Sequence, residues 1–286
     1  MYELSYCYYQ ANQLTKAIEG FKQLSGQKDS LGQNSMYLLG DCYLRTNQKA
    51  NARNAFQYSA YNSSNKLQQQ ISRFNYAKLS YELGYQDIAL NEMKKYLNDY
   101  PNSEYNTEAK EILVSLMANT NNFADALQLY ESFDKPTASM QKVYPRILYG
   151  RAVELINDQQ IKIGDDLLTK ILTLPNSSVT PYANFWKGEI AYRNKEYDNA
   201  IKYLSFYMLA NVPAQGEANK NTANYDLGYS WLQKENYNKA LGYFEQITKT
   251  VAVTSPAMEQ DAYVRSADCY FMASDFTKAN TMYDNV

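Results

Sequence analysis

The chain has 286 residues, with 28 basic and 30 acidic side chains and no histidine. The near-zero net charge argues against a nucleic-acid-binding face, which needs clustered Lys and Arg. The lack of histidine removes the usual general acid-base near neutral pH and the commonest metal ligand. A hydrophobic content of 45% excludes a disordered chain. With only 11 Gly and 7 Pro, the composition disfavours an all-β fold and indicates helices.

Along the chain, a small residue recurs within an apolar helical pattern at intervals of 35 to 40 residues. Larger, mostly apolar residues follow it at +4 and +7, so all three share one face of a helix, which we name helix B. A period of this length is typical of a solenoid, a propeller or a repeat array. The eight small residues are Ala17, Ala52, Ala89, Ala126, Gly164, Ala200, Ala240 and Ala279.

A second small residue, 12 positions earlier, marks another apolar helix in most repeats, which we name helix A. We expect short polar turns to join the two helices, because small side chains allow antiparallel helices to approach closely. In the fifth repeat Gly150 is assigned to this slot, which places two extra residues in the turn before Gly164. The other helix A residues are Ser5, Gly40, Ala77, Val114, Gly188, Gly228 and Ala267.

This pattern resembles the tetratricopeptide repeat, best in LGDCYLRTNQKANARNAF, WKGEIAYRNKEYDNAIKYL and LGYSWLQKENYNKALGYF. The resemblance implies an all-α fold, a right-handed superhelix of about eight helix-turn-helix repeats. All periods here exceed the family's roughly 34 residues, so longer loops are expected between repeats. We expect one solenoid domain over residues 1–286, with units near 1–28, 34–63, 70–102, 106–136, 143–176, 181–212, 220–250 and 256–286.

In that family, a stripe on helix A lines the concave surface. It holds the residues at −3, +1 and +4 from the small residue, and here it is rich in aromatic side chains. Such rings offer large contact area at low entropic cost, which indicates a groove for an extended peptide or a partner helix. The alternative is that the rings pack on helix A of the next repeat. The candidate partner-binding residues are Tyr37, Phe74, Lys78, Tyr81, Arg151, Phe185, Glu189, Tyr192, Tyr225 and Tyr229.

The three cysteines, Cys7, Cys42 and Cys269, share one position, two residues after the small residue of helix A. Other repeats place Leu, Ile, Ala or Ser there, so we expect buried packing residues rather than nucleophiles, which would need a base. The sequence contains no metal-ligand cluster, cofactor signature or catalytic motif. We therefore expect no enzyme activity, no metal and no cofactor.

These observations favour a non-enzymatic scaffold for protein–protein interaction, whose partner is a protein or peptide bound in the aromatic groove. The alternatives are an envelope glycan- or cell-wall-binding module, with tyrosines stacked on sugar rings, and an architectural spacer. We expect no nucleic-acid partner. We also expect no transmembrane segment, because every apolar run falls far short of about 20 residues.

Two expectations concern the context of the chain. Met1 lies within a helix and Val286 on an apolar helix face, whereas solenoids normally end in polar caps. The chain is therefore expected to be a segment of a longer protein, or to bind another copy through its uncapped ends. Segments such as DYPNSE resemble bacterial envelope members of the family, the outer-membrane assembly lipoproteins and the Tol-associated periplasmic proteins. This favours a periplasmic or outer-membrane-attached location over the cytoplasm.

Overall fold

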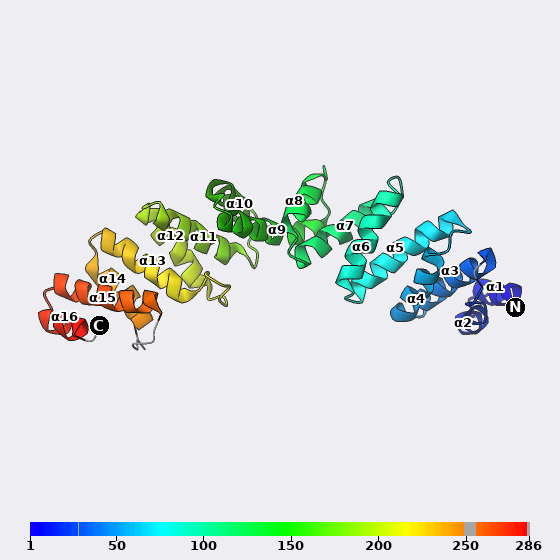
Figure 1. Ribbon diagram of the computed structural model, residues 1–286, viewed down its shortest axis with the longest axis horizontal. Helices are drawn as coiled ribbons and strands as arrows, with labels where there is room; N and C mark the ends of the chain where they lie inside the picture. Colours follow the sequence, from blue (N-terminus) through cyan, green and yellow to red (C-terminus); the bar gives the residue numbers. More distant parts are fainter. Residues whose placement is uncertain (28, 249–255, 285–286) are drawn as a thin grey trace. The chain divides into compact units, whose positions relative to one another are not determined.

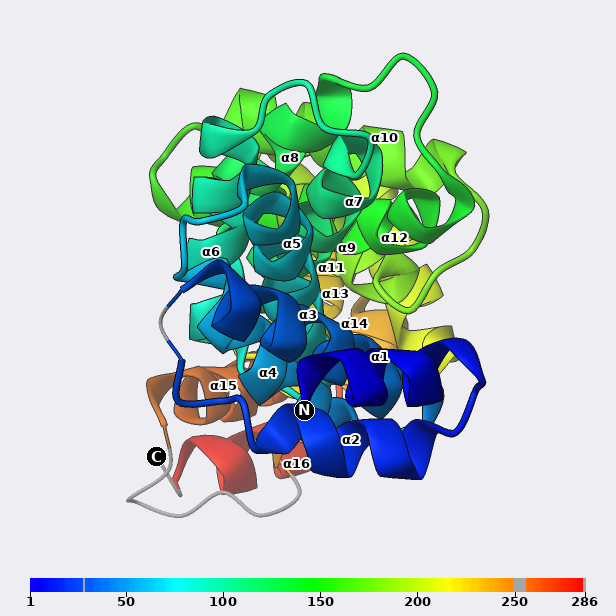
Figure 2. The same cartoon turned by 90° about the vertical axis from the view of Figure 1, so that its right-hand side faces the viewer.

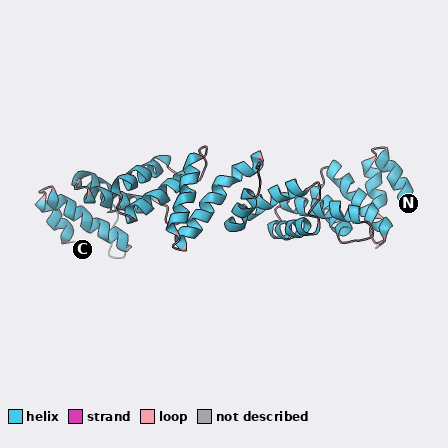
Figure 3. Cartoon of the chain, turned by 90° about the horizontal axis from the view of Figure 1, so that it is seen from above, coloured by secondary structure: helices cyan, strands magenta, loops and turns pink. Residues whose placement is uncertain are grey.

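The computed structural model describes residues 1–27, 29–248 and 256–284. Within these ranges the regular secondary structure is helical and includes no β-strand (Figure 3), which confirms the all-α prediction. The helices are α1 (Tyr2–Gln10), α2 (Leu14–Lys22), α3 (Ser30–Arg45), α4 (Lys49–Ala60), α5 (Lys66–Glu82), α6 (Gln86–Asp99), α7 (Asn106–Asn119), α8 (Phe123–Glu131), α9 (Ala138–Asn157), α10 (Ile161–Thr173), α11 (Thr180–Arg193), α12 (Tyr197–Ala210), α13 (Lys220–Gln233), α14 (Tyr237–Ile247), α15 (Ala257–Met272) and α16 (Phe276–Tyr283).

Consecutive helices form pairs, in which the odd-numbered helix is helix A and the even-numbered helix is helix B (Figure 1). The pairs α1/α2, α3/α4 and α11/α12 each pack side by side, and the first of these is seen clearly in Figure 2. The chain folds as two compact units, residues 1–144 and 145–286, and the boundary between them falls inside α9. We name them unit 1 and unit 2.

Helix A and helix B meet through the small residues that the sequence pattern identified. A Cβ atom on Gly188 would lie 2.5 Å from Cγ of Leu204, and one on Gly228 would lie 2.6 Å from the ring of Phe244. Leu204 and Phe244 are the +4 residues of their B helices, and both are fully buried. The small residue therefore makes room for a large helix B side chain to lie directly on helix A, which confirms the predicted close approach.

The turn inside each pair has one geometry throughout the described chain. Its middle residue adopts a left-handed backbone conformation, with φ between 57° and 83°. The next N–H then donates to the carbonyl five residues earlier, as Gln48 does to Tyr43 at 2.7 Å, which satisfies the end of helix A. The left-handed residues are Asn12, Asn47, Gly84, Asn121, Gln159, Lys195, Glu235 and Ser274.

This turn corrects the fifth repeat. Gln159 takes the left-handed position at φ 62°, and Gln160 N–H donates to the Leu155 carbonyl at 2.8 Å. The spacing found in the other repeats then makes Ala152, which is fully buried, the small residue of helix A. The assignment of Gly150 and of two extra turn residues is wrong. Side-chain size alone could not separate Gly150 from Ala152, because both are small and buried; the turn decides, and the 12-residue spacing back from Gly164 agrees with it.

The cysteine position is buried at Cys42 and Cys269, as predicted, but Cys7 is exposed. Among the described helices, α3 and α15 each pack against the preceding helix B, whereas α1 contacts only α2 and α3. Burial raises the pKa of the Cys42 and Cys269 thiols to about 11, which leaves both thiols protonated near neutral pH. All three cysteines are free.

Candidate binding surface on the A helices

In unit 2 the centre of the stripe is a pair of tyrosines on α13. The hydroxyls of Tyr225 and Tyr229 both donate to Oδ2 of Asp261 on α15, the first at 2.9 Å. Arg265, one turn along α15, donates to the other oxygen of Asp261 at 3.3 Å. The two rings lie 4.8 Å apart, edge to face, and each is half-buried. Both ring orientations are thus set by the next repeat.

The hydroxyls of this pair stay protonated and act as donors. The pKa of Tyr225 is raised by burial above all, and by its bond to Asp261. The pKa of Tyr229 is raised further by the same causes. Neither hydroxyl ionises in the neutral range, so the Asp261 carboxylate remains their fixed acceptor.

A buried acidic pair lies behind the stripe. Glu189 of α11 is 8% exposed and accepts from Arg193 Nε at 2.6 Å, and Asp226 of α13 is 3% exposed. Burial, and next the hydrogen bond to Glu189, raise the pKa of Asp226 to about 10. Asp226 therefore carries a proton at neutral pH, which its carboxyl group donates to Glu189. Glu189 is held inside the fold rather than offered to a partner.

Among the predicted contact residues of this unit, the third half-buried ring is Tyr192, on α11. Its ring lies 6.4 Å from that of Tyr229, and it is half-buried. Desolvation, followed by the charges of Asp226 and other neighbours, raises its pKa. Tyr192, Tyr225 and Tyr229 are brought together as the sequence pattern predicted, and we name them the unit 2 stripe.

In unit 1 the stripe carries both rings and charge. Tyr37 is half-buried and packs edge-on against Phe56 at 6.2 Å. Lys78 Nζ pairs with Glu108 Oε1 of the next helix A at 2.6 Å. Tyr81 is half-buried. Tyr37, Lys78 and Tyr81 therefore each present part of their side chain to the solvent, and we name them the unit 1 stripe.

Besides the buried Glu189, three of the predicted contact residues do not lie on an accessible stripe. Phe74 and Phe185 are 2% and 0% exposed, because each is enclosed by other aromatic rings, and a partner cannot reach them. Arg151 pairs with Glu154 at 3.0 Å, and the corrected register places it at −1 from Ala152, not at +1. These positions support the surface or lie beside it.

The structure adds Tyr149 to the stripes and shows the contacts of Tyr9, which the pattern places at +4 from Ser5. The corrected register places Tyr149 at −3, where it accepts from Nε1 of Trp186 at 3.4 Å. The 12-residue spacing alone would have found it. In unit 1 the Tyr9 hydroxyl donates to Asp41 Oδ2 at 2.8 Å, and Arg45 lies over its ring at 5.5 Å. This repeats the tyrosine–aspartate–arginine chemistry of α13 and α15.

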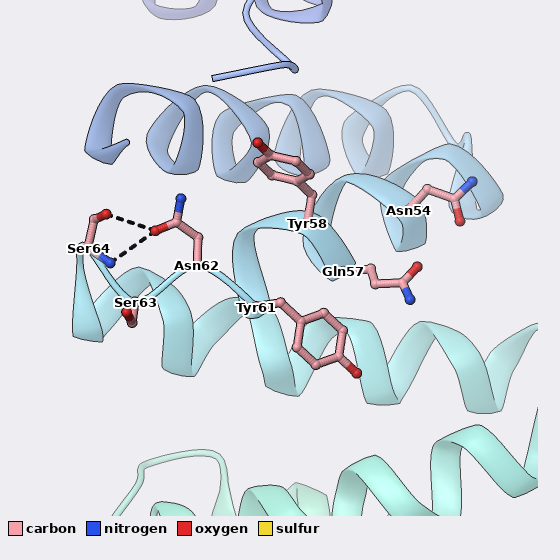
Figure 4. Close-up of a pocket in the computed structure, with 7 residues that line it drawn as sticks. All are labelled: Asn54, Gln57, Tyr58, Tyr61, Asn62, Ser63 and Ser64. Carbon is pink, nitrogen blue, oxygen red and sulfur yellow. Dashed lines mark hydrogen bonds between the residues drawn. The ribbon is translucent and has the colours of Figure 1, made fainter. Parts of the chain in front are cut away.

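A polar hollow of about 620 Å³ lies in unit 1 beside α4. Figure 4 shows Tyr58 and Tyr61 pointing in opposite directions from α4, and Asn62 bonded to both the backbone and the side chain of Ser64. Tyr58 donates to the Gln27 carbonyl at 2.7 Å, and the ring of Tyr61 is 59% exposed. Among the residues that the structure describes, those lining the hollow are all uncharged.

Other chemistry is sparse in the part of the chain that the structure describes. Among the described residues, no group of three or more Cys, Asp or Glu side chains is arranged to hold a metal ion. Over the same residues, no helix is both long enough and apolar enough to cross a membrane.

Exposed apolar side chains gather on the first helix pair and on the last, including Leu4 and Phe276. Val286 lies outside the described residues.

Comparison with known proteins agrees with this geometry. Residues 34–58, which cover most of α3 and α4, match the tetratricopeptide repeat family. The turn and the small-residue contacts of that pair recur along the described chain. The α3/α4 pair is therefore identified as a tetratricopeptide repeat.

Several solved structures of tetratricopeptide repeat proteins are similar to the chain. The C-terminal part of a repeat protein from Cytophaga hutchinsonii is 16% identical, with 92% of this chain and 99% of that chain covered and a TM-score of 0.47. A repeat protein from Parabacteroides merdae is 14% identical, with 92% and 96% covered and a TM-score of 0.42. PilF of Pseudomonas aeruginosa is 12% identical, with 85% and 97% covered and a TM-score of 0.43. No curated protein sequence matches the chain.

Proposed function

We propose that the chain is a non-enzymatic interaction scaffold that binds a protein or peptide through the tyrosine stripes of its A helices. The observation that carries the proposal is the pair Tyr225 and Tyr229, whose hydroxyls are tied to Asp261 while part of each ring faces solvent. A ring that is already held loses little entropy when a partner covers it. Tyrosine also supplies large contact area with few rotatable bonds.

The stripe differs from the family's carboxylate-gripping constellation, which needs several basic residues on adjacent repeats. The accessible stripe residues here are mostly aromatic, and Lys78 is already paired with Glu108. We therefore infer an extended peptide or a partner helix whose apolar side chains cover the tyrosine rings.

The test begins with a peptide selected against the whole chain from a display library. Tyr225→Ala and Tyr229→Ala should each weaken its binding by about tenfold or more, as expected for loss of an aromatic anchor. Tyr203→Ala is the matched control, because Tyr203 lies on α12, a helix B, and therefore outside the stripe. Unchanged affinity in both stripe variants, measured by calorimetry, would show that the peptide binds elsewhere.

A second candidate function, glycan binding, is favoured by the tyrosine, amide and hydroxyl groups that line the hollow of Figure 4. Exposed tyrosine rings beside amide and hydroxyl groups suit sugar rings and their hydroxyls. A glycan array separates the two proposals: binding that is lost in Tyr61→Ala supports the glycan module. Periplasmic or outer-membrane attachment and association with another copy also stay proposals, to be tested by cell fractionation and by light scattering.

A further inference from the structure

A second groove lies in unit 2 between α12, α13 and α14, with a volume of about 640 Å³. Asn224 and Trp231 of α13 form part of its wall, together with Lys220, Lys239 and Tyr243. Measured from Gly228, Asn224 and Trp231 are at −4 and +3, which places them about 300–320° around the helix. The stripe positions +1 and +4 lie at about 100° and 40°, so this groove uses another face of α13.

Two polar groups in this wall are buried without partners. Asn224 is 5% exposed, and its Oδ1 accepts no hydrogen bond. The indole Nε1 of Trp231 is buried and donates to nothing. The other tryptophan, Trp186, donates to Tyr149. An unpaired buried donor or acceptor costs about 1–3 kcal/mol, so such groups are rare unless something satisfies them.

The charged residues of the wall have one sign. Lys220 and Lys239 both line the groove, and among the described residues no Asp or Glu does so. Lys220 Nζ donates to the Asn211 side chain at 2.7 Å, and Lys239 Nζ lies 3.9 Å above the Trp231 ring. Among the described residues neither lysine has a carboxylate partner. The groove therefore favours a ligand that brings negative charge.

The spacing of the two unpaired groups selects the shape of the ligand. Asn224 and Trp231 are seven residues apart on one helix face, which is about 10 Å along the axis. About three residues of extended peptide span this length, and each offers one N–H donor and one carbonyl acceptor. Space remains along α14, because a Cβ on Gly242 would meet nothing within 4 Å.

We propose that this groove binds an extended acidic peptide segment. One backbone N–H of the peptide donates to Asn224 Oδ1, and a carbonyl farther along accepts from Trp231 Nε1. Acidic side chains of the peptide pair with Lys220 and Lys239. The site is separate from the tyrosine stripes, so the chain holds two binding faces in unit 2.

The two tryptophans allow a site-specific test by NMR of the nitrogen-15-labelled protein, since each indole N–H gives its own signal. Trp186→Phe assigns the signals. The probe is the capped hexapeptide Glu-Ala-Glu-Ala-Glu-Ala, and Lys-Ala-Lys-Ala-Lys-Ala is the control. The acidic peptide should shift the Trp231 indole proton downfield and leave the Trp186 signal in place, and added salt should reverse the shift.

Charge reversal identifies the lysines. Lys220→Glu and Lys239→Glu should each weaken the acidic peptide by at least about tenfold, as expected when a charge-assisted contact is lost. Lys202→Glu, on α12 outside the groove, should have no effect. Asn224→Leu should abolish the Trp231 shift while the protein becomes no less stable, because the change removes an unpaired acceptor.

Three outcomes would overturn the proposal: a Trp231 signal that does not move at saturating acidic peptide, an equal shift with the lysine peptide, and a shift produced only by an oligogalacturonate. The last would make the groove an acidic-glycan site. Tyr229→Ala should leave the hexapeptide affinity unchanged, so failure here and failure of the stripe proposal are distinguishable.

Discussion

The two units differ in how completely their buried polar groups are hydrogen-bonded. In unit 1 the fully buried amide of Gln33 is saturated: Nε2 donates to the carbonyls of Asn62 and Asn65 at 2.8 and 3.0 Å, and Oε1 accepts from Asn65 N–H at 2.6 Å. This one side chain ties α3 to the segment between α4 and α5. Its polar atoms complete the fold and leave nothing for a ligand.

In unit 2 two buried polar atoms have no hydrogen-bond partner, Oδ1 of Asn224 and Nε1 of Trp231. The buried carboxyl groups of Glu189 and Asp226 are paired only because Asp226 is protonated. Unit 1 also has unpaired oxygens, at Gln68 and Asn106, but each of these amide groups is bonded through its nitrogen, whereas the indole of Trp231 has no other polar atom. Because the helix-pair geometry is the same in both units, the difference lies in side chains and not in the backbone. Unpaired buried groups lower the stability of unit 2, and they can be satisfied by a proton, as at Asp226, or by a ligand, as at Asn224 and Trp231.

The largest expected effect is at Gln33. Gln33→Ala should lower the free energy of unfolding by about 3 kcal/mol, because it strands several backbone groups and leaves a cavity. Gln57→Ala, on the surface of α4, is the control and should change little. Chemical denaturation measures both. Equal values for the two variants would remove the distinction between the units.

The next effect tests whether the apolar packing is equivalent in both units. Gly40→Ala and Gly228→Ala should each cost about 2 kcal/mol, because the new Cβ would lie under 3 Å from a buried phenylalanine ring. Gly242→Ala, in open space on α14, should instead stabilise the helix by about 0.5–1 kcal/mol. A large difference between Gly40 and Gly228 would mean that more than polar groups separates the units.

The third prediction concerns the proton on Asp226. The folded state binds this proton up to a pH of about 10, whereas an unfolded aspartate releases it near pH 4. The stability of unit 2 should therefore fall as the pH rises between these values and recover on acidification. Asp226→Asn should raise the unfolding free energy at pH 8 by about 1–2 kcal/mol and flatten this dependence. Unfolding curves at pH 5 and pH 8 measure it, and a pH dependence identical to wild type would contradict the assignment.

The smallest effect is at the turns. Lys195 and Glu235 adopt left-handed φ values of 63° and 59°, which are costly for residues with a Cβ. Lys195→Gly or Glu235→Gly should each raise the free energy of unfolding by about 0.5–1 kcal/mol. Gly84→Ala, at φ 83°, is the reverse substitution and should destabilise unit 1. Thermal unfolding that moves the same way in all three variants would argue against this account of the turn.

The sequence alone predicted the paired helices, the repeat spacing and most of the contact residues between helices. It failed where two small residues competed, as at Gly150 and Ala152, and where a repeat lacked a neighbour, as at Cys7. For the stripe it left two interpretations open, contact with a partner and packing on the next repeat. The structure is compatible with both. The hydroxyls of Tyr225 and Tyr229 bond to the next repeat, while part of each ring stays accessible.

The repeat and its close helix contacts were determined by the sequence, because both depend on side-chain size at a regular local spacing. Only the tertiary structure decided which rings a partner can reach and which polar atoms lack a hydrogen bond. Those properties depend on residues far along the chain, as with Tyr225 and Asp261, 36 positions apart. A pattern read within one helix does not specify what the neighbouring repeat places against it.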